Sequence, residues 1–231
     1  MKRFYKQVSV AAADGGWQVQ LDGRGIRTAG KRAQVVPTVT LADAMAAEWA
    51  GQGEEIDPTV FLFRDMADYA IDVIAPDPAV AITAILPYAG TDTLCYRDDE
   101  GSALNRRQAA VWEPLLLAAE ARFDVRFERV ASIMHCPQPD ETMARMQAVV
   151  STLDPFALAP LQTLTSLAAS LVIGLAALVP GADAQALWDA ANLEEDWQTE
   201  LWGKDAEAEA RRAKRLADFT AAIRFATLAR G

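Results

Sequence analysis

The sequence predicts an α+β protein, with a small N-terminal antiparallel β-containing domain followed by a C-terminal all-α helical bundle domain. Two patterns support this prediction. Apolar residues alternate with polar ones near the N-terminus, as in strands, and recur at helical spacing through most of the remaining chain. The 231 residues, 52% of them hydrophobic, are enough to bury a substantial core in one large domain or two small ones.

Residues 1–37 are predicted to form a small antiparallel meander. Asp14-Gly15-Gly16 and Asp22-Gly23 fit tight hairpin turns, because glycine readily adopts the positive φ that such turns need. The alternating apolar positions of the strands are Val8, Val10, Trp17, Val19 and Leu21.

Two helices are predicted to follow the meander. Thr40 is placed to cap the first, which runs through LADAMAAEWAGQ and ends at Gly51. Asp57 caps the second, with Pro58 in its first turn, and the apolar stripe of this helix continues until Pro76.

The rest of the chain is predicted to be mainly helical. A short apolar helix over residues 80–86 precedes the segment TDTLCYRDDEG, which fits either a strand or a loop, and FDVRFERV has the pattern of an exposed strand. Further helices are expected from Leu104, with a kink at Pro114, and from Asp140, Asp183 and about Asp205.

The uncharged segment from Leu161 to Val179 has 19 residues, which at about 1.5 Å per residue would just cross a bilayer as a helix. We expect a buried central helix instead, because the segment contains several polar residues, has acidic flanks at Asp154 and Asp183 and lacks an aromatic belt. The polar residues are Gln162, Thr163, Thr165, Ser166 and Ser170.

The charge balance argues against nucleic acid and anionic membranes as partners. Asp and Glu total 32 against 22 Lys and Arg, which gives a formal net charge of −10 and a pI near 4.6. Cys95 and Cys136 have no motif spacing and favour a reducing compartment, and a single histidine, His135, excludes a multi-histidine metal site. The opening MKRFYKQVSV has neither an apolar signal core nor an Arg-rich presequence, so the sequence supports neither secretion nor organelle import.

The stretch from Gly25 to Lys31, GIRTAGK, matches the spacing of a phosphate-binding loop as far as its lysine. Arg32 then stands where a Ser or Thr hydroxyl should bind magnesium, and the strand-like AQVVP follows where a helix N-terminus is needed. We therefore expect a glycine-rich hairpin turn here and no bound nucleotide.

Catalysis has little support in the sequence. Asp65, Asp68 and Asp72 share a helix face, and the alternative function they suggest is that of a small metal-dependent enzyme, although such spacing is more typical of a solvated surface. His135 and Cys136 are neighbours on an extended segment, where side chains point to opposite faces, so a thiol-imidazole pair is disfavoured. No nucleophile elbow or paired CxxC occurs, and we expect no catalytic residue, cofactor or metal.

The segment LWDAANLEEDWQTELWG, from Leu187 to Gly203, carries an unusual surface. As one continuous helix it would place two tryptophans and a glutamate on a single stripe, which is typical of a protein interface. The alternative is a helix packed within its own domain, with that glutamate at the rim. The residues of this stripe are Trp188, Ala191, Glu195, Gln198 and Trp202. The opposite side of the helix carries Leu193, Trp197 and Leu201.

The chain as a whole resembles a known family. The opening RFYKQVSV, the LDGRGIRT turn, PTVTLADAMAAEWAGQ, YAGTDTLCYR, QAAVWEPLL and especially LEEDWQTELWG occur in order across nearly the whole chain. Together they resemble the ATP12 chaperone family, which assembles the catalytic sector of the F-type ATP synthase and is specific for the alpha subunit. No single segment is a chemical signature, but their joint occurrence is specific.

The resemblance implies a non-enzymatic molecular chaperone with an N-terminal domain over residues 1–95, containing the β meander and helices, and a helical domain over residues 96–231. Such a protein binds the unassembled alpha subunit and prevents its aggregation until the beta subunit replaces it, without an ATP requirement. Because eukaryotic members begin with a presequence and this chain starts at its motif, we expect a bacterial cytoplasmic protein. A processed form in the mitochondrial matrix is the alternative.

Positions that match the family motifs divide into two expected roles. Partner binding is assigned to the cluster nearest the carboxyl end of the chain, Glu194, Glu195, Gln198, Trp202 and Gly203. Structural roles are assigned to Trp49 and Trp112, each on an apolar helical stripe, and to Tyr88 and Asp92 in the YAGTD segment.

Overall fold

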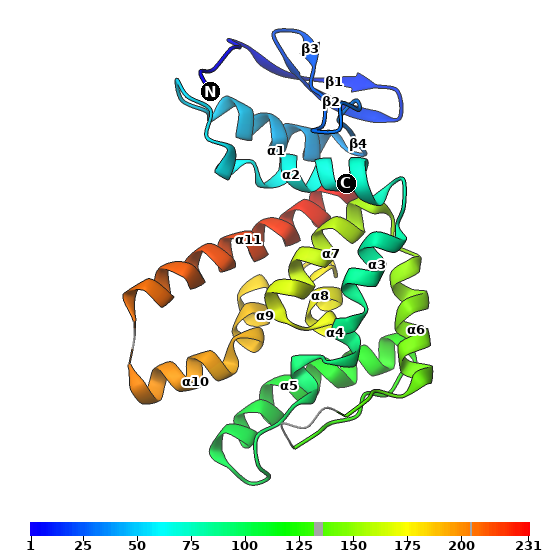
Figure 1. Ribbon diagram of the computed structural model, residues 1–231, viewed down its shortest axis with the longest axis vertical. Coiled ribbons are helices and arrows are strands. Elements are labelled where there is room, and N and C mark those ends of the chain that lie inside the picture. Colours follow the sequence, from blue (N-terminus) through cyan, green and yellow to red (C-terminus); the bar gives the residue numbers. More distant parts are fainter. Residues whose placement is uncertain (132–135, 204) are drawn as a thin grey trace. The chain divides into compact units, whose positions relative to one another are not determined.

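The computed structural model describes residues 1–131, 136–203 and 205–231, and it confirms the predicted α+β class (Figure 1). The described chain divides into two compact units. Unit 1 comprises Met1–Val80, Asp154–Pro160 and Ala221–Gly231, and unit 2 comprises Ala81–Leu153 and Leu161–Thr220. Each unit is therefore built from segments that are separated in the sequence. The division into domains over residues 1–95 and 96–231 stays a prediction.

Unit 1 contains a four-stranded antiparallel sheet. Strands β1 (Val8–Ala13) and β2 (Gly16–Leu21) form a hairpin, and both β3 (Arg24–Gly25) and β4 (Val35–Val36) pair with β2.

The two predicted hairpin turns are confirmed by positive φ angles at Gly15 and at Asp22 and Gly23. Gly16 is required for a further reason, because a Cβ atom there would lie 2.2 Å from the carbonyl oxygen of Val36 on β4. The hairpin packs this closely against β4 only with glycine at position 16.

Helix α1 (Val39–Ala50) begins slightly earlier than predicted. The cap is Thr38, whose Oγ1 accepts the N–H of Leu41 at 3.1 Å, whereas Thr40 already lies inside the helix. Thr38 has extended backbone angles, which suit a cap, and it directly follows Pro37.

The predicted cap at Asp57 is confirmed, but it starts a 3₁₀ turn, η1 (Pro58–Val60), rather than the helix itself. Helix α2 (Leu62–Tyr69) follows and continues as the π-helical turn η2 (Ala70–Ile74).

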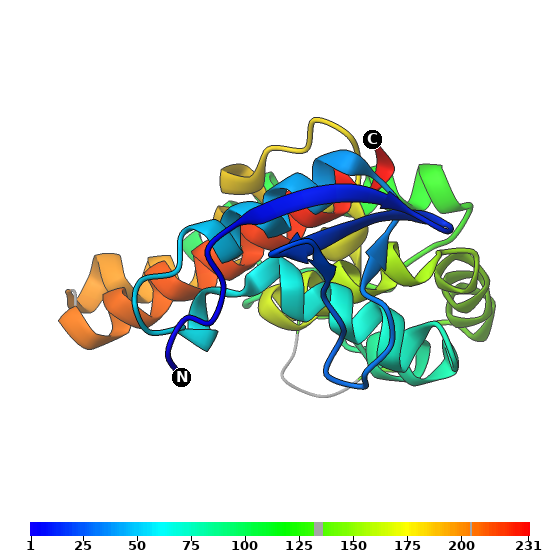
Figure 2. The ribbon, with the colours of Figure 1, turned by 90° about the horizontal axis from the view of Figure 1, so that it is seen from above.

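The core of unit 1 lies between the sheet and helices α1 and α2, and Figure 2 shows β1 and β2 lying across α1. Aromatic rings from distant parts of the sequence meet in this core, since Phe225 lies 6.2 Å from Phe63 and 6.4 Å from Phe156 between ring centroids. Buried members of the core include Tyr5, Val19, Leu21, Ile26, Val36, Leu41, Met45, Trp49, Phe61 and Phe63.

The predicted helical character of the remaining chain is confirmed. Its helices are α3 (Ala79–Ile85), α4 (Pro87–Gly90), α5 (Ala103–Phe123), α6 (Asp140–Ser151), α7 (Pro155–Ala168), α8 (Leu171–Ala177), α9 (Ala184–Ala191), α10 (Leu193–Trp202) and α11 (Ala206–Arg230). The segment TDTLCYRDDEG forms a 3₁₀ turn, η3 (Thr93–Cys95), followed by a loop.

The strand predicted for FDVRFERV is wrong. Residues 124–131 form no strand, and only an isolated bridge joins Val130 to Tyr96. Side chains bind the backbone of this segment instead, because Glu120 accepts the N–H of Phe127 at 2.8 Å and Gln138 accepts that of Glu128 at 2.8 Å.

The single helix predicted for Leu161 to Val179 is also wrong, although most of the segment is buried. The chain breaks at Ala169, where φ is 48°, and Ser170 caps α8 by accepting the N–H of Ile173 at 3.0 Å. Among the described residues, no single helix has both the length and the hydropathy of a membrane span. Two consecutive helical segments, Leu62–Ile74 and Ala79–Cys95, meet these criteria only when they are taken together as a bent pair.

Candidate functional site

The surface predicted for Leu187 to Gly203 is reorganised by a break at Asn192. Its side-chain amide donates to the carbonyl oxygen of Trp188 at 2.8 Å, and α9 ends and α10 begins on either side of it. Trp188 is buried against Phe219, whereas Trp202 is 80% exposed. The continuous stripe from Trp188 to Trp202 is therefore wrong, and α10 alone carries the exposed surface.

Three of the five predicted contact residues meet in one groove of about 490 Å³ in unit 2. Glu194, Gln198 and Trp202 are four residues apart on α10 and therefore share a face. We call this cavity the α10 groove. Its lining residues are Tyr96, Arg97, Asp98, Asp99, Leu104, Glu194, Trp197, Gln198, Leu201 and Trp202.

The other two predicted contact residues lie elsewhere. Glu195 is not in the groove, and its carboxylate lies 3.8 Å from a guanidinium nitrogen of Arg215 on α11. Gly203 ends α10 with φ at 91°, a left-handed conformation that favours glycine.

The α10 groove combines an apolar wall with acidic groups. Leu201 is 58% exposed beside Trp202, and Trp197, predicted on the opposite side of the helix together with Leu201, lines the same cavity. Carboxylates are supplied by Glu194 on α10 and by Asp98 and Asp99 in the loop before α5. An apolar surface of this kind, edged by charge, is typical of a protein interaction site.

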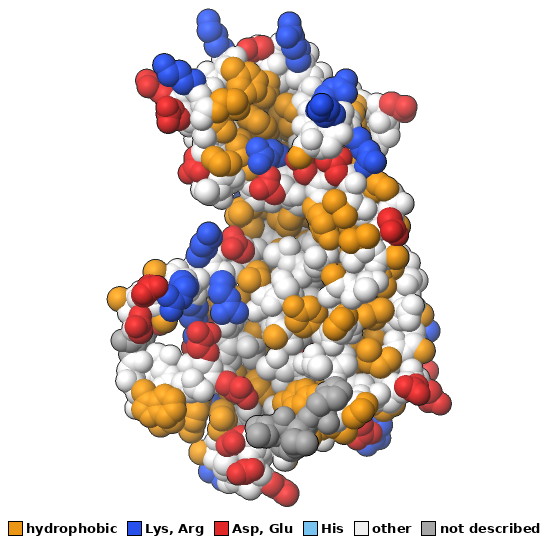
Figure 3. Space-filling view, viewed as in Figure 1, with side chains coloured by type: hydrophobic (Ala, Val, Ile, Leu, Met, Phe, Trp, Pro, Cys, Tyr) orange, Lys and Arg blue, Asp and Glu red, His pale blue; other side chains and the backbone are white. Residues whose placement is uncertain are grey.

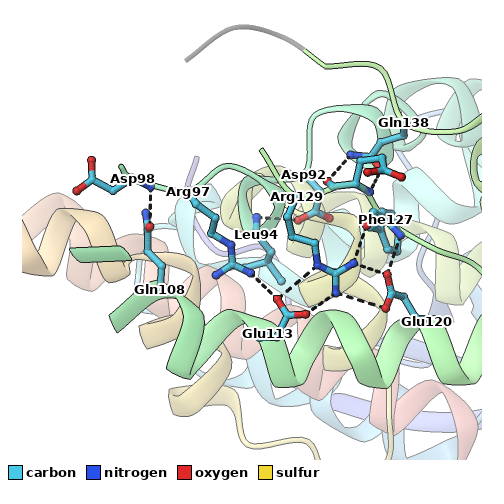
Figure 4. Close-up of polar contacts among 11 residues, drawn as sticks. Asp92, Leu94, Arg97, Asp98, Gln108, Glu113, Glu120, Phe127, Arg129 and Gln138 are labelled. Atoms are coloured by element: carbon cyan, nitrogen blue, oxygen red, sulfur yellow. Dashed lines mark hydrogen bonds and ion pairs between the residues drawn. The ribbon is translucent and has the colours of Figure 1, made fainter. Parts of the chain in front are cut away.

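Buried Gln108 on α5 joins the two sides of the groove. Its side-chain oxygen accepts the N–H of Asp98 at 2.8 Å, and its side-chain nitrogen donates to Glu194 at 2.6 Å (Figure 4 shows the bond to Asp98). Arg107, one residue earlier, makes a bidentate pair with Glu200 at 2.7 and 2.9 Å. These contacts fix α10 against α5.

A charged network that the sequence did not reveal supports the loop side of the groove. Figure 4 shows Glu113 of α5 between two guanidinium groups, with Arg97 at 3.2 Å and Arg129 at 2.8 Å, and Arg129 also pairs with Glu120. Burial by itself would lower the pKa of Arg129, but hydrogen bonds to Glu120 and Glu113 raise it above its ordinary value. The guanidinium of Arg97 lies 5.2 Å from the ring of Trp112.

The residues that were expected to have structural roles are buried or half-buried. Trp112 is fully buried, and its indole N–H donates to the carbonyl oxygen of Ala190 at 2.7 Å, while Trp49 belongs to the core of unit 1. Tyr88 is half-buried on α4.

Asp92 is completely buried in unit 2. Its carboxylate accepts the N–H groups of Leu94 at 3.1 Å and Val172 at 3.0 Å, and burial raises its pKa to about 6. This single carboxylate therefore joins η3 to the start of α8.

The acidic residues considered for a metal-dependent enzyme form hydrogen bonds and an ion pair within the protein. Asp72 accepts hydrogen bonds from the Thr28 hydroxyl at 2.7 Å and the Gly30 N–H at 2.6 Å, and Asp68 accepts the Ala29 N–H at 3.1 Å. Asp65 pairs with the adjacent Arg64 at 2.6 Å.

These contacts contradict the metal-enzyme alternative, because Asp68 and Asp72 hold the loop that contains GIRTAGK while Asp65 pairs with Arg64. Within the described ranges, no three His, Cys, Asp or Glu side chains are grouped so that they could hold a metal.

The thiol chemistry considered for this chain has no support at Cys95. This residue is fully buried in unit 2, and burial raises the pKa of its thiol to about 12, so the thiolate is absent at neutral pH. His135 lies outside the described residues.

Comparison with known proteins gives the family. Residues 2–120 match the family model for ATP12 chaperone protein. The chain is 25% identical over 215 residues to protein atp12, mitochondrial, of Schizosaccharomyces pombe, which covers 87% of this chain and 74% of the relative.

Two crystal structures resemble the whole chain. Atp12 from Paracoccus denitrificans is 37% identical with a TM-score of 0.92, covering 99% of this chain and 98% of that one. The Atu1473 protein from Agrobacterium tumefaciens is 39% identical with a TM-score of 0.92, covering 98% and 85%. The chain described here therefore belongs to the ATP12 chaperone protein family, whose members assist ATP synthase assembly and are not enzymes.

Proposed function

We propose that this protein binds the unassembled alpha subunit of the F-type ATP synthase and prevents its aggregation until the beta subunit replaces it. Family membership supports a chaperone of ATP synthase assembly, and the sequence resemblance supports the alpha subunit as client. We also propose a bacterial cytoplasmic location, with the mitochondrial matrix as the alternative, since the relatives include bacterial proteins and a mitochondrial one.

The observation that carries this proposal is the exposure of Trp202 and Leu201 beside a groove. An unassembled subunit exposes apolar surface that its neighbour normally covers, and such surface aggregates unless another protein covers it. Tryptophan is enriched among the residues that dominate binding energy, so Trp202 is the best candidate for the main contact.

The acidic edge of the groove adds selectivity. Asp98, Asp99 and Glu194 favour a client segment that combines apolar side chains with Lys or Arg, and they disfavour an acidic one. The same charges reduce association between copies of this acidic chain.

Release by competition fits the size of the groove. A cavity of about 490 Å³ contacts only a short client segment, so a larger surface on the beta subunit would displace the chaperone. Release in this way requires no bound nucleotide.

Trp202→Ala tests the proposal. We expect affinity for purified alpha subunit to fall about 30-fold, as for a contact of about 2 kcal/mol, and suppression of its aggregation to fall in parallel. Leu117→Ala is the matched control, because Leu117 is 54% exposed on α5 but does not line the groove. Equal effects of the two substitutions, or no binding by the wild-type protein, would contradict the proposal.

Glu195→Lys tests the second face of α10. We propose that Glu195 also contacts the client, and the substitution should weaken aggregation suppression, because it reverses a half-exposed charge beside Arg215. Thermal stability should change little, since an exposed ion pair contributes little to folding. A large loss of stability would make Glu195 a purely structural residue.

A further inference from the structure

Unit 1 contains a second cavity, which the proposed function does not use. It has a volume of about 560 Å³ and opens beside the N-terminal segment, the turn between β2 and β3, and α1. Its floor consists of the buried apolar side chains Tyr5, Leu21, Ile26 and Trp49. This volume suits one or two side chains of a bound peptide.

Aromatic contacts hold the floor of this cavity in place. Tyr5 packs against the ring of Trp49 at 5.6 Å between centroids, and its hydroxyl donates to the carbonyl oxygen of Trp49 at 2.6 Å. Both side chains are buried, so the floor is already formed in the free protein.

The mouth of the cavity is basic, in contrast to the chain as a whole. Arg24 and Arg27 line it, and both are exposed. The one carboxylate in the lining, Asp22, already accepts the N–H groups of Lys6 at 3.1 Å and Gln7 at 2.8 Å.

The N-terminal segment that carries these arginines is basic as a whole. Residues 1–37 hold seven Lys and Arg against two Asp, although the whole chain has a formal net charge of −10. Figure 3 shows Lys and Arg side chains projecting around an apolar patch in the part of the molecule that carries the sheet. The mouth also has an apolar contact of its own, because Phe4 lines the cavity and is 63% exposed.

We propose that this cavity is a second client-binding surface, which takes an extended acidic segment of the protein that the chaperone binds. An apolar side chain of the segment enters the cavity, and a neighbouring Asp or Glu pairs with Arg24 and Arg27. The inference rests on the proposed function, and it assigns to unit 1 a charge preference opposite to that of the α10 groove in unit 2.

Arg24→Glu tests the charge preference. Association with purified alpha subunit at low salt should slow about fivefold or more, and the difference should disappear at high salt, because a charge at the edge of an interface acts mainly on the association rate. Lys214→Glu is the matched control, since it makes the same charge change at an exposed residue of unit 2 that lines neither this cavity nor the α10 groove. We expect less than a twofold effect from it.

The outcomes separate the two proposals. If Arg24→Glu binds like its control while Trp202→Ala is weakened, the second surface is wrong and the proposed function stands. Faster association of Arg24→Glu than of wild type would also overturn the acidic occupant. Failure of the wild-type protein to bind the alpha subunit would refute both.

Discussion

Asp92→Asn gives a quantitative test of the polar interior of unit 2. The carboxyl group is fully buried, and burial raises its pKa from 3.8 to about 6. Asparagine keeps one acceptor oxygen but cannot ionise, so the two proteins differ in one titrating group.

The sign follows from which state holds the proton more tightly. Between the two pKa values the folded protein keeps the Asp92 proton while the unfolded chain releases it, so the contribution of Asp92 to stability is greatest in acid. That contribution is lost as the pH rises through the folded pKa of about 6. At 1.36 kcal/mol per pKa unit, the full effect is about 3 kcal/mol, of which about 2 kcal/mol falls between pH 4.5 and pH 7.5.

The measurement is the unfolding free energy of both proteins in urea at several pH values, read by circular dichroism. The difference, wild type minus Asp92→Asn, should decrease by about 2 kcal/mol from pH 4.5 to pH 7.5. Other titrating groups cancel in this difference, and the loss of the acceptor for Val172 adds a pH-independent offset. A flat difference, or one that increases with pH, would refute the reasoning, as would a carboxyl pKa near 4 measured for Asp92 by NMR.

Three further predictions address other parts of the chain. Gly16→Ala should destabilise the protein by more than about 2 kcal/mol in thermal unfolding, because the added Cβ would meet the carbonyl of Val36 at 2.2 Å, and an unchanged melting temperature would contradict this. Iodoacetamide at pH 8 should label half-buried Cys136 and leave Cys95 unmodified, as mass spectrometry of the intact protein would show, and equal labelling would exclude the burial assigned to Cys95. Gln108→Ala should cost about 1–3 kcal/mol and increase hydrogen exchange in α10, because it removes a buried link between that helix and the facing loop, and unchanged exchange there would argue against it.

Local chemistry made much of the fold predictable from the sequence. The two glycine-containing turns, the cap at Asp57 and the helical stripes follow from residue types that strongly prefer one backbone conformation. The helix breaks at Asn192 and Ser170 were not predicted. At each break a side chain forms a hydrogen bond with the nearby backbone and so divides the helix. A periodic pattern in the sequence continues through such residues without interruption.

The candidate site was only partly predictable. Helical spacing placed Gln198 and Trp202 on one face, but it put Glu195 beside them, and Glu194, which lines the groove, entered only through the family resemblance. The opposite wall of the groove comes from the loop before α5, and its position depends on Gln108 and on the pairing of Arg97 with Glu113. Such contacts between distant segments leave no periodic signal in the sequence.

The composition of unit 1 has a consequence for biosynthesis. Phe225 is part of its core, and the Thr38 hydroxyl donates to the carbonyl oxygen of Leu228. The sheet and its helices therefore leave the ribosome long before Ala221–Gly231, which completes their packing. A nascent chain that stalls before that segment emerges would display an open apolar core, so unit 1 needs protection from aggregation until Ala221–Gly231 has been synthesised.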